Sequence, residues 1–438
     1  MLIYFLPRKL AADLVTWVGG LSLLAVQFHH YFINQVKESG LEVDLIFMLN
    51  FSRLHMFAVN YDNAGKLDDA DADKKLTTRE RFYAETLREK VSFGDWLCYF
   101  FFCGTCPTGM VHEYRTFHDF INLKGDFQNI PVDKLPMQAL KRFGQMVFVV
   151  VLMILVSINF SFDYLLTQEW SDLPFVYRAG YLVGAIHFKV YTLFVGFVSM
   201  EANFIACGQS YQPAGRNKDS TYREESFNSI RQVVMLPVET QISWHEAVVS
   251  WNISVHHWLK YYVMLRLLDR NKPKGQMQVV PMALTFIISA AWHGCQLGFF
   301  MMFVGFAMME YLIKVGSKTK AWAWCYENVP FVVYQPLKWL YNHFIAAYLV
   351  IQFQLMHWSL FTKVHRELYF CGHWTLFAAV LFVTFAPKVR RNQTGKGQAD
   401  AQKAGLTTPP ASGNNSPDDS QKSASTQSSG SKDKKKTQ

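Results

Sequence analysis

Charged residues are scarce in this chain. Of its 438 residues, only 18% are Asp, Glu, Lys or Arg, whereas 50% are hydrophobic and 16% are aromatic. A soluble domain usually carries about 25% charged residues. Much of the charge lies in two segments, residues 62–90 and the tail from Lys388 onward. The rest contains several apolar runs near the roughly 20 residues that a helix needs to cross a bilayer. The composition predicts an all-α polytopic membrane protein and argues against a soluble fold.

Several catalytic signatures are also missing. The sequence has no Gly-rich phosphate loop, no GxSxG nucleophile elbow, no HxxHH cluster of the kind that holds iron, and no internal repeat. Transporters often show such repeats. Cys103 and Cys106 have CxxC spacing, but no second pair completes a zinc site. We therefore expect inert thiols, no metal site and no bound cofactor. A redox or metal pair is the alternative for the cysteines, and a channel or transporter is the alternative for the whole chain.

The net charge of +9 is not distributed in the manner of a nucleic-acid-binding protein. From Lys388 to the end there are ten Lys or Arg against four Asp, so this tail alone supplies +6. A basic segment directly after the last apolar run predicts a cytosolic C-terminus. We expect residues 1–387 to form the membrane domain and 388–438 a basic, disordered tail, because its composition cannot bury a core. The final Lys435-Lys436-Thr437-Gln438 resembles a dilysine signal for the endoplasmic reticulum.

The apolar runs predict the helices. The first, at about residues 12–33, is too long for a cleavable signal peptide. Charged residues interrupt 43–61, which predicts a helix buried against protein or re-entrant, and the short run 93–106 also predicts a partial or re-entrant segment. The run 175–206 predicts two helices or one that lines a hydrated cavity, with Lys189 and Glu201 as candidate partners. Further spans are expected at 143–166, 279–315, 337–359 and 367–387, with a break near Gly294 and Gly298.

The stretch from Thr285 to Gly298 carries an ionisable side chain at bilayer depth. Thr285, Ser289 and His293 fall at i, i+4 and i+8, so one helix would carry them as a polar stripe, with Gln296 three residues further on. An intramembrane ionisable residue is a functional candidate by default. The alternative is a histidine that merely packs against a neighbouring helix.

A second polar stripe is expected on a helix within residues 243–268. Ser243-Trp-His-Glu246 has the form of a capping box, which predicts a helix start. His245, Asn252 and His256 would then share one face. Lys260, Tyr262 and Arg266 follow on the same predicted helix, and such residues suit either a membrane interface or an anionic ligand.

A neutral histidine and an asparagine facing each other favour one kind of chemistry. Imidazole has an ordinary pKa near 6.5, so His293 can act as a general base near pH 7. The amide of Asn252 can orient a hydroxyl group or donate to a developing oxyanion. A base and an amide donor, without a serine elbow, suit direct acyl transfer to an alcohol.

The residues around this pair resemble a known family. Trp251-Asn252-Ile253-Ser254, then Trp258-Leu259, then Ser289-Ala-Ala-Trp292-His293-Gly294 are similar to the motifs of the membrane-bound O-acyltransferases, in particular the lysophospholipid acyltransferase branch. Asn60-Tyr61-Asp62 with Gly65 and the segment 101–120 are similar to its earlier motifs. The resemblance covers about residues 10–387. It departs at Cys295-Gln-Leu-Gly-Phe299, where the branch often has Pro-Gly-Tyr.

The resemblance implies a bundle of about 8–11 transmembrane and re-entrant helices around a central cavity. It also implies transfer of a fatty acyl group from acyl-CoA to the free hydroxyl of a lysophospholipid in the endoplasmic reticulum membrane, with His293 and Asn252 as the active-site pair. A non-phospholipid acceptor is the alternative within the family. Candidate substrate-binding residues are Trp251, His256, Trp292, Ser289, Lys260, Tyr262 and Arg266, of which Lys260, Tyr262 and Arg266 are candidates for the phosphates of CoA.

Overall fold

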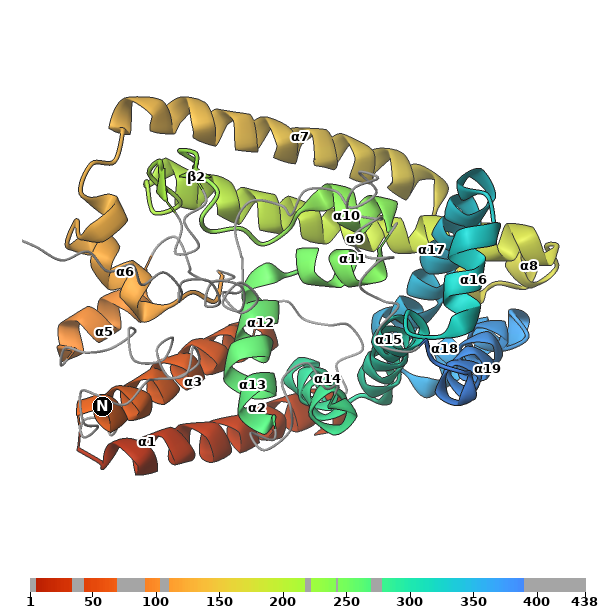
Figure 1. Cartoon of the computed structure of the whole chain (residues 1–438), viewed down its shortest axis with the longest axis horizontal. Helices are drawn as coiled ribbons and strands as arrows, with labels where there is room; N and C mark the ends of the chain where they lie inside the picture. The colour runs from red at the N-terminus through yellow and green to blue at the C-terminus, as the bar shows by residue number, and fades with distance from the viewer. Residues whose placement is uncertain are drawn as a thin grey trace, which may run out of the picture.

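The structure is a computed structural model that describes residues 5–33, 43–68, 91–102, 110–216, 222–241, 243–268 and 278–389. This described part is almost entirely helical (Figure 1). Its regular β structure is one short antiparallel pair, β1 (Gly215–Arg216) with β2 (Tyr222–Arg223). The predicted all-α class is therefore confirmed. The Cys103–Cys106 pair and the basic tail from Arg390 lie outside the described residues.

The N-terminal helix confirms the first predicted span. The segments α1, η2, α2 and η3 follow one another without a break from Arg8 to Ile33, and together they are long and apolar enough to cross a membrane. Helix α3 packs beside them and buries Arg53 and His55. The expectation of a helix buried against protein at 43–61 is thus confirmed. The bounds are α1 (Arg8–Leu14), η2 (Val15–Gly19), α2 (Gly20–Phe28), η3 (His29–Ile33) and α3 (Val43–Asp68).

Two long helices, α7 (Leu135–Asn159) and α9 (Phe175–Ala206), run side by side along one edge of the molecule (Figure 1). Helix α9 is one unbroken helix of 32 residues, so the two-helix alternative for this run is wrong. The candidate Lys189–Glu201 pair is also wrong, because the carboxylate of Glu201 lies against Arg142 of α7 at 3.2 Å. Arg142 becomes the partner of Glu201 only because α7 packs on α9, which the sequence alone does not show.

The C-terminal half contains helices α14 to α19. The predicted break in the run 279–315 is confirmed, since α14 ends at His293 and α15 begins at Leu297. Helix α15 packs closely on α17: a Cβ added to Gly298 would lie 2.1 Å from the carbonyl oxygen of Gln352. The bounds are α14 (Val279–His293), α15 (Leu297–Gly316), α16 (Lys320–Asn328), α17 (Phe331–Leu355), α18 (Trp358–Glu367) and α19 (Cys371–Phe385).

Within the described ranges, four helices are long and apolar enough to cross a membrane alone, at 8–33, 132–166, 175–206 and 297–316. The pair α18 and α19, bent by 81°, makes a fifth if it counts as one broken span. Helix α3 packs on the first of these spans, and the short helix α14 contacts both the first span and α15. The result is the polytopic helical bundle that the sequence predicts.

The segment 243–268 is the main departure from the predicted helices. Ser243 does cap a helix start, since its Oγ atom accepts from the N–H of Glu246 at 3.3 Å. The helix then breaks at Asn252, whose φ of 44° and ψ of 56° are left-handed. The single polar face through His245, Asn252 and His256 is therefore wrong, because His245 precedes the break. The pieces are α11 (Trp244–Ser250), α12 (Ile253–Trp258), η7 (Leu259–Met264) and α13 (Leu265–Leu267).

The remaining short elements connect these helices. They are α5 (Phe93–Phe100), α6 (Tyr114–Ile121), η4 (Gly125–Phe127), η5 (Val132–Lys134), η6 (Tyr164–Leu166), α8 (Gln168–Ser171) and α10 (Met235–Thr240).

Candidate functional site

His293 is the last residue of α14, and aromatic rings surround its imidazole. Phe303 of α15 stacks on it with ring centres 5.3 Å apart, and Phe353 of α17 meets it edge-on at 5.0 Å. Neither imidazole nitrogen has a hydrogen-bond partner in the part of the chain that the structure describes. The ring is thus held by packing, and both of its nitrogens remain available for hydrogen bonding.

The turn of α14 that carries His293 is tied to the N-terminal helices. The indole N–H of Trp292 donates to the carbonyl of Met48 on α3 at 2.9 Å, and the side chain of Gln27 on α2 donates to the carbonyl of Trp292 at 2.9 Å. Trp292 and Gln27 are both buried. These bonds fix the backbone next to His293, so Trp292 has a structural role whatever else it contacts.

The residue after His293 is a glycine, and there is no room for a side chain at this position. A Cβ on Gly294 would lie 2.5 Å from the ring of Phe299 and 2.6 Å from the side-chain oxygen of Gln296. The amide of Gln296 is buried, and it has no hydrogen-bond partner among the described residues. The same holds for the amide of Gln352 on α17. Two unpaired buried amides therefore lie on the segments that flank the histidine.

Asn252 occupies the break between α11 and α12. Its left-handed backbone is rare for residues other than glycine, and asparagine is one of the few side chains that tolerate it. Its side chain does not cap α12 and has no hydrogen-bond partner among the described residues. The left-handed backbone alone can explain why this residue is an asparagine. Its side-chain amide, which has no partner among the described residues, is also available for a chemical role.

Helix α15 connects the surroundings of the two residues. Phe303 and Phe306 lie at i and i+3, and therefore on the same side of the helix. Phe303 stacks on His293, while Phe306 meets Trp244 of α11 edge-on at 5.1 Å. Trp244 is in the helix that leads directly into Asn252. One face of α15 thus borders both the end of α14 and α11, near the middle of the molecule in Figure 1.

A chain of charged groups continues along α15. His245 Nδ1 lies 3.3 Å from one oxygen of Glu310, and Lys314 Nζ lies 3.2 Å from the other. His256, one turn after Asn252, is close enough to both His245 and Glu310 to interact with their charges. The sequence did not indicate Glu310, because its position beside His245 depends on how α15 packs on α11.

The other candidate residues separate into distinct surroundings. Trp251 packs on Phe194 and Phe197 of α9, with ring centres 5.8 and 5.5 Å away. Ser289 is buried within α14, in the stripe that the sequence predicts. Arg266 is exposed at the far end of the 243–268 segment. The structure therefore does not gather all of the candidates around His293.

Tyr262 and Lys260 make contacts within the protein. The hydroxyl of Tyr262 donates to the carboxylate of Glu113 at 2.5 Å, and Asn60 of α3 donates to the same carboxylate at 2.9 Å. Tyr262 is almost completely buried. The Nζ atom of Lys260 lies 5.2 Å from the centre of the Tyr261 ring. The Tyr262 cluster ties α3 to η7 and the loop before α6.

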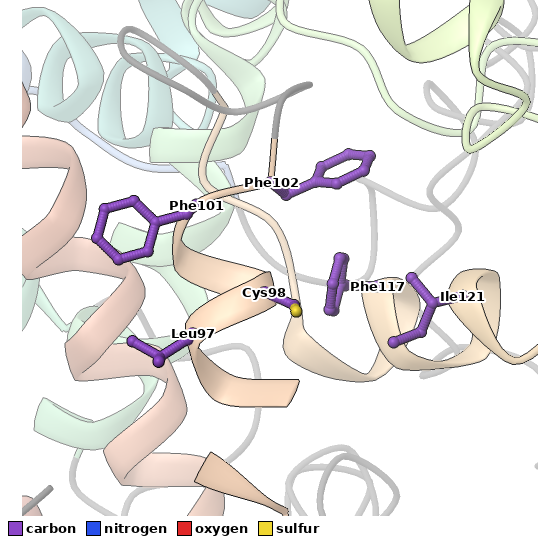
Figure 2. A pocket seen from close by; sticks show the side chains of 6 residues that line it. All are labelled: Leu97, Cys98, Phe101, Phe102, Phe117 and Ile121. Carbon is purple, nitrogen blue, oxygen red and sulfur yellow. The ribbon is translucent and has the colours of Figure 1, made fainter. Parts of the chain in front are cut away.

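An apolar hollow of about 470 Å³ lies between α5 and α6 (Figure 2). Figure 1 places these helices at the left end of the molecule, away from α15. None of the candidate residues lines the hollow, whose walls are Leu97, Cys98, Phe101, Phe102, Phe117 and Ile121. Within the described ranges no three His, Cys, Asp or Glu side chains are grouped so as to hold a metal ion.

Comparisons with known proteins agree with the motifs. The profile of the membrane-bound O-acyltransferase family matches residues 8–319. A lysophospholipid acyltransferase of Saccharomyces cerevisiae is 26% identical over 307 residues, which cover 66% of this chain and 47% of that protein. Lysophospholipid acyltransferase 5 of Mus musculus is 25% identical over 342 residues (74% and 64%), and a lysophospholipid acyltransferase of Schizosaccharomyces pombe is 23% identical over 412 residues (90% and 76%).

The chain spans about half to two thirds of the length of the first two of these relatives. The family match, by contrast, extends over most of this chain, from α1 to the residue that precedes α16. It contains both the Asn252 turn and the end of α14 at His293. This chain belongs to the membrane-bound O-acyltransferase family.

Proposed function

We propose that the protein is a lysophospholipid acyltransferase, which transfers a fatty acyl group from acyl-CoA to the free hydroxyl of a lysophospholipid. The relatives named above carry that activity in their names. The observation that carries the chemical part is the imidazole of His293, packed between aromatic rings with its nitrogens free.

In the proposed step, a nitrogen of His293 takes the proton from the lysophospholipid hydroxyl. The oxygen then attacks the thioester carbonyl carbon, and the C–O bond forms as the carbonyl oxygen gains negative charge. Asn252 orients the hydroxyl or donates its amide N–H to this oxyanion. The intermediate collapses, the C–S bond breaks, and the CoA thiolate leaves with the proton from the imidazolium. No metal or bound cofactor takes part in this step.

The remaining candidate residues and the location belong to the same proposal. Ser289, Trp251, Trp292 and His256 lie near the pair in sequence and are proposed as substrate contacts, together with Lys260, Tyr262 and Arg266. We place residues 1–387 in the endoplasmic reticulum membrane as a multi-pass domain, with residues 388–438 in the cytosol.

The test is incorporation of a labelled acyl chain by the purified chain in lipid nanodiscs. Acyl-CoAs of mixed chain length are supplied with lysolipids that carry choline, ethanolamine, serine or inositol, and the products are identified by mass spectrometry. We expect diacyl product from at least one headgroup with wild-type protein, formed at least a hundredfold more slowly by His293→Ala. A sterol or diacylglycerol arm covers other acceptors. Product from those acceptors alone, or equal product from His293→Ala, would contradict the proposal.

A further inference from the structure

A buried carboxylate on α9 lies behind the turn that holds Asn252. Glu201 is fully buried, and its Oε1 atom accepts from the backbone N–H of Gln232 at 2.6 Å and of Val233 at 3.0 Å. Its Oε2 atom lies 3.2 Å from Nη2 of Arg142 on α7. A buried charge needs both a partner and hydrogen bonds. Glu201 has both, so residues 232 and 233 are fixed against the α7–α9 pair.

Two arginines, Arg142 and Arg231, lie near the single carboxylate of Glu201 on this side of the turn. Arg231 adjoins Gln232, and burial together with repulsion from Arg142 lowers the pKa of its guanidinium, while the carboxylate of Glu201 opposes that shift. Arg142 also donates to Gln145 at 2.8 Å. Arg142 and Arg231 therefore both lie near the one carboxylate that accepts from the backbone N–H groups of Gln232 and Val233.

Gln232 in turn binds the two residues that follow Asn252. Its backbone carbonyl accepts from the N–H of Ile253 at 2.8 Å, and its side-chain Oε1 accepts from the N–H of Ser254 at 3.1 Å. These N–H groups belong to the first turn of α12, where a helix has no internal acceptors for them. Because the side chain of Asn252 makes no cap, Gln232 caps α12 from a different segment.

A further hydrogen bond closes the turn on its other side. The N–H of Val234 donates to the carbonyl of Ser250 at 3.0 Å. Asn252 therefore lies between residues that are bonded on both sides to the same three-residue segment. Unusual backbone conformations persist only where the surroundings over-determine them. The left-handed backbone of Asn252, and with it the direction of its Cα–Cβ bond, is held by the hydrogen bonds to residues 232–234.

We propose that Gln232 and Glu201 are positioning residues that hold the amide of Asn252 for the acyl-transfer step. Neither side chain touches substrate, and both act through the backbone of the turn. We name this pair the Glu201–Gln232 latch. The inference rests on the proposed function, in which Asn252 contacts the reacting atoms.

The first test uses purified full-length variants in nanodiscs. Gln232→Met removes the acceptor for Ser254 with little change of shape, and we expect kcat to fall on the order of tenfold to a hundredfold, with KM for both substrates unchanged. Glu201→Met should act likewise, whereas Glu201→Gln keeps an acceptor oxygen and should retain more activity. Both Met variants keeping wild-type kcat would overturn the proposal.

A matched control separates positioning from general loss of stability. Arg178 of α9 and Glu367 of α18 form another ion pair, with Nη1 and Oε2 3.5 Å apart. Glu367→Gln should lower the thermal midpoint while kcat stays near the wild-type value. If Glu367→Gln lowers kcat as much as Gln232→Met at an equal loss of stability, the latch has no special role.

A double variant tests whether the latch acts through Asn252. In the Asn252→Gly background the amide is already absent, so adding Gln232→Met should lower kcat no further. Groups that act as one unit show such non-additivity. Full additivity of the two losses would overturn the proposal.

Hydrogen exchange distinguishes failure of the latch from failure of the proposed function. The amide of Ser254 should exchange slowly in wild-type protein and at least tenfold faster in Gln232→Met, whatever the enzyme acylates, because this variant loses the side-chain acceptor and keeps the backbone carbonyl that binds Ile253. Unchanged exchange at Ser254 would overturn the latch. Faster exchange in a protein that transfers no acyl chain would keep the latch and reject the proposed function.

Discussion

Replacing Asn252 by glycine separates two explanations for an asparagine at this position. The backbone there is left-handed, with φ of 44°. One explanation is conformational, because asparagine enters that region more readily than most residues. The other is chemical, because the amide is available to a substrate. Asn252→Gly removes the amide while keeping a residue that adopts this backbone without strain.

The two explanations predict different magnitudes. Loss of one oxyanion donor lowers kcat by roughly 10²–10³, which corresponds to about 2.7–4 kcal/mol. If the asparagine is needed only for its backbone conformation, Asn252→Gly should keep its activity. It should then lose only about 0.4–1 kcal/mol of stability, because glycine gives the unfolded chain greater entropy. Asn252→Ala adds a strain of roughly 1–2 kcal/mol, because its Cβ disfavours the left-handed region.

The assay is acyl incorporation at saturating substrate, together with a thermal midpoint for each purified variant. We expect Asn252→Gly to lose at least a hundredfold in kcat with a midpoint near wild type. Asn252→Ala should lose a similar activity and melt earlier. If Asn252→Gly keeps activity within about threefold of wild type, the amide has no chemical role and the residue is there for its backbone.

Two further predictions concern His293 and Gly298. His293→Ala should lower kcat by about 10²–10⁴ without loss of protein from the membrane fraction, and wild-type activity in this variant would exclude the histidine as base. Gly298→Ala should destabilise the protein by about 1–3 kcal/mol, because its Cβ would meet the carbonyl of Gln352 at 2.1 Å. Gly144→Ala on α7 is the control, since nothing lies within 4 Å of its Cβ, and equal loss in both variants would contradict the packing argument.

Hydropathy was sufficient to predict the long helices. The first span, predicted at about 12–33, and the break after His293 follow from apolar length and from Gly294, whereas apolar length left open whether 175–206 forms one helix or two. These features depend on local composition, which can be seen in a single sequence. The bend between α18 and α19 could not be predicted from hydropathy, because it depends on which helices pack against each other there.

The site was predictable only in part, for a related reason. The motif around Asn252 identified the residue, but the regular helical period of 243–268 concealed the left-handed break. That break is stabilised by Gln232, which is 20 positions away, and by Glu201 on another helix. Such contacts leave no periodic signal, so the sequence alone predicts a continuous helix where tertiary hydrogen bonds interrupt it.

The segment after His293 is where this chain departs from the pattern of its branch, and the structure gives that departure a physical meaning. Phe299 packs on Phe353 with ring centres 4.6 Å apart, and both rings border the imidazole of His293. The position of Phe299 also requires Gly294, because any Cβ there would collide with its ring. Phe299 therefore forms part of the wall around the imidazole of His293, so a change at this position alters the surroundings of His293 directly while the His293–Gly294 motif itself stays the same.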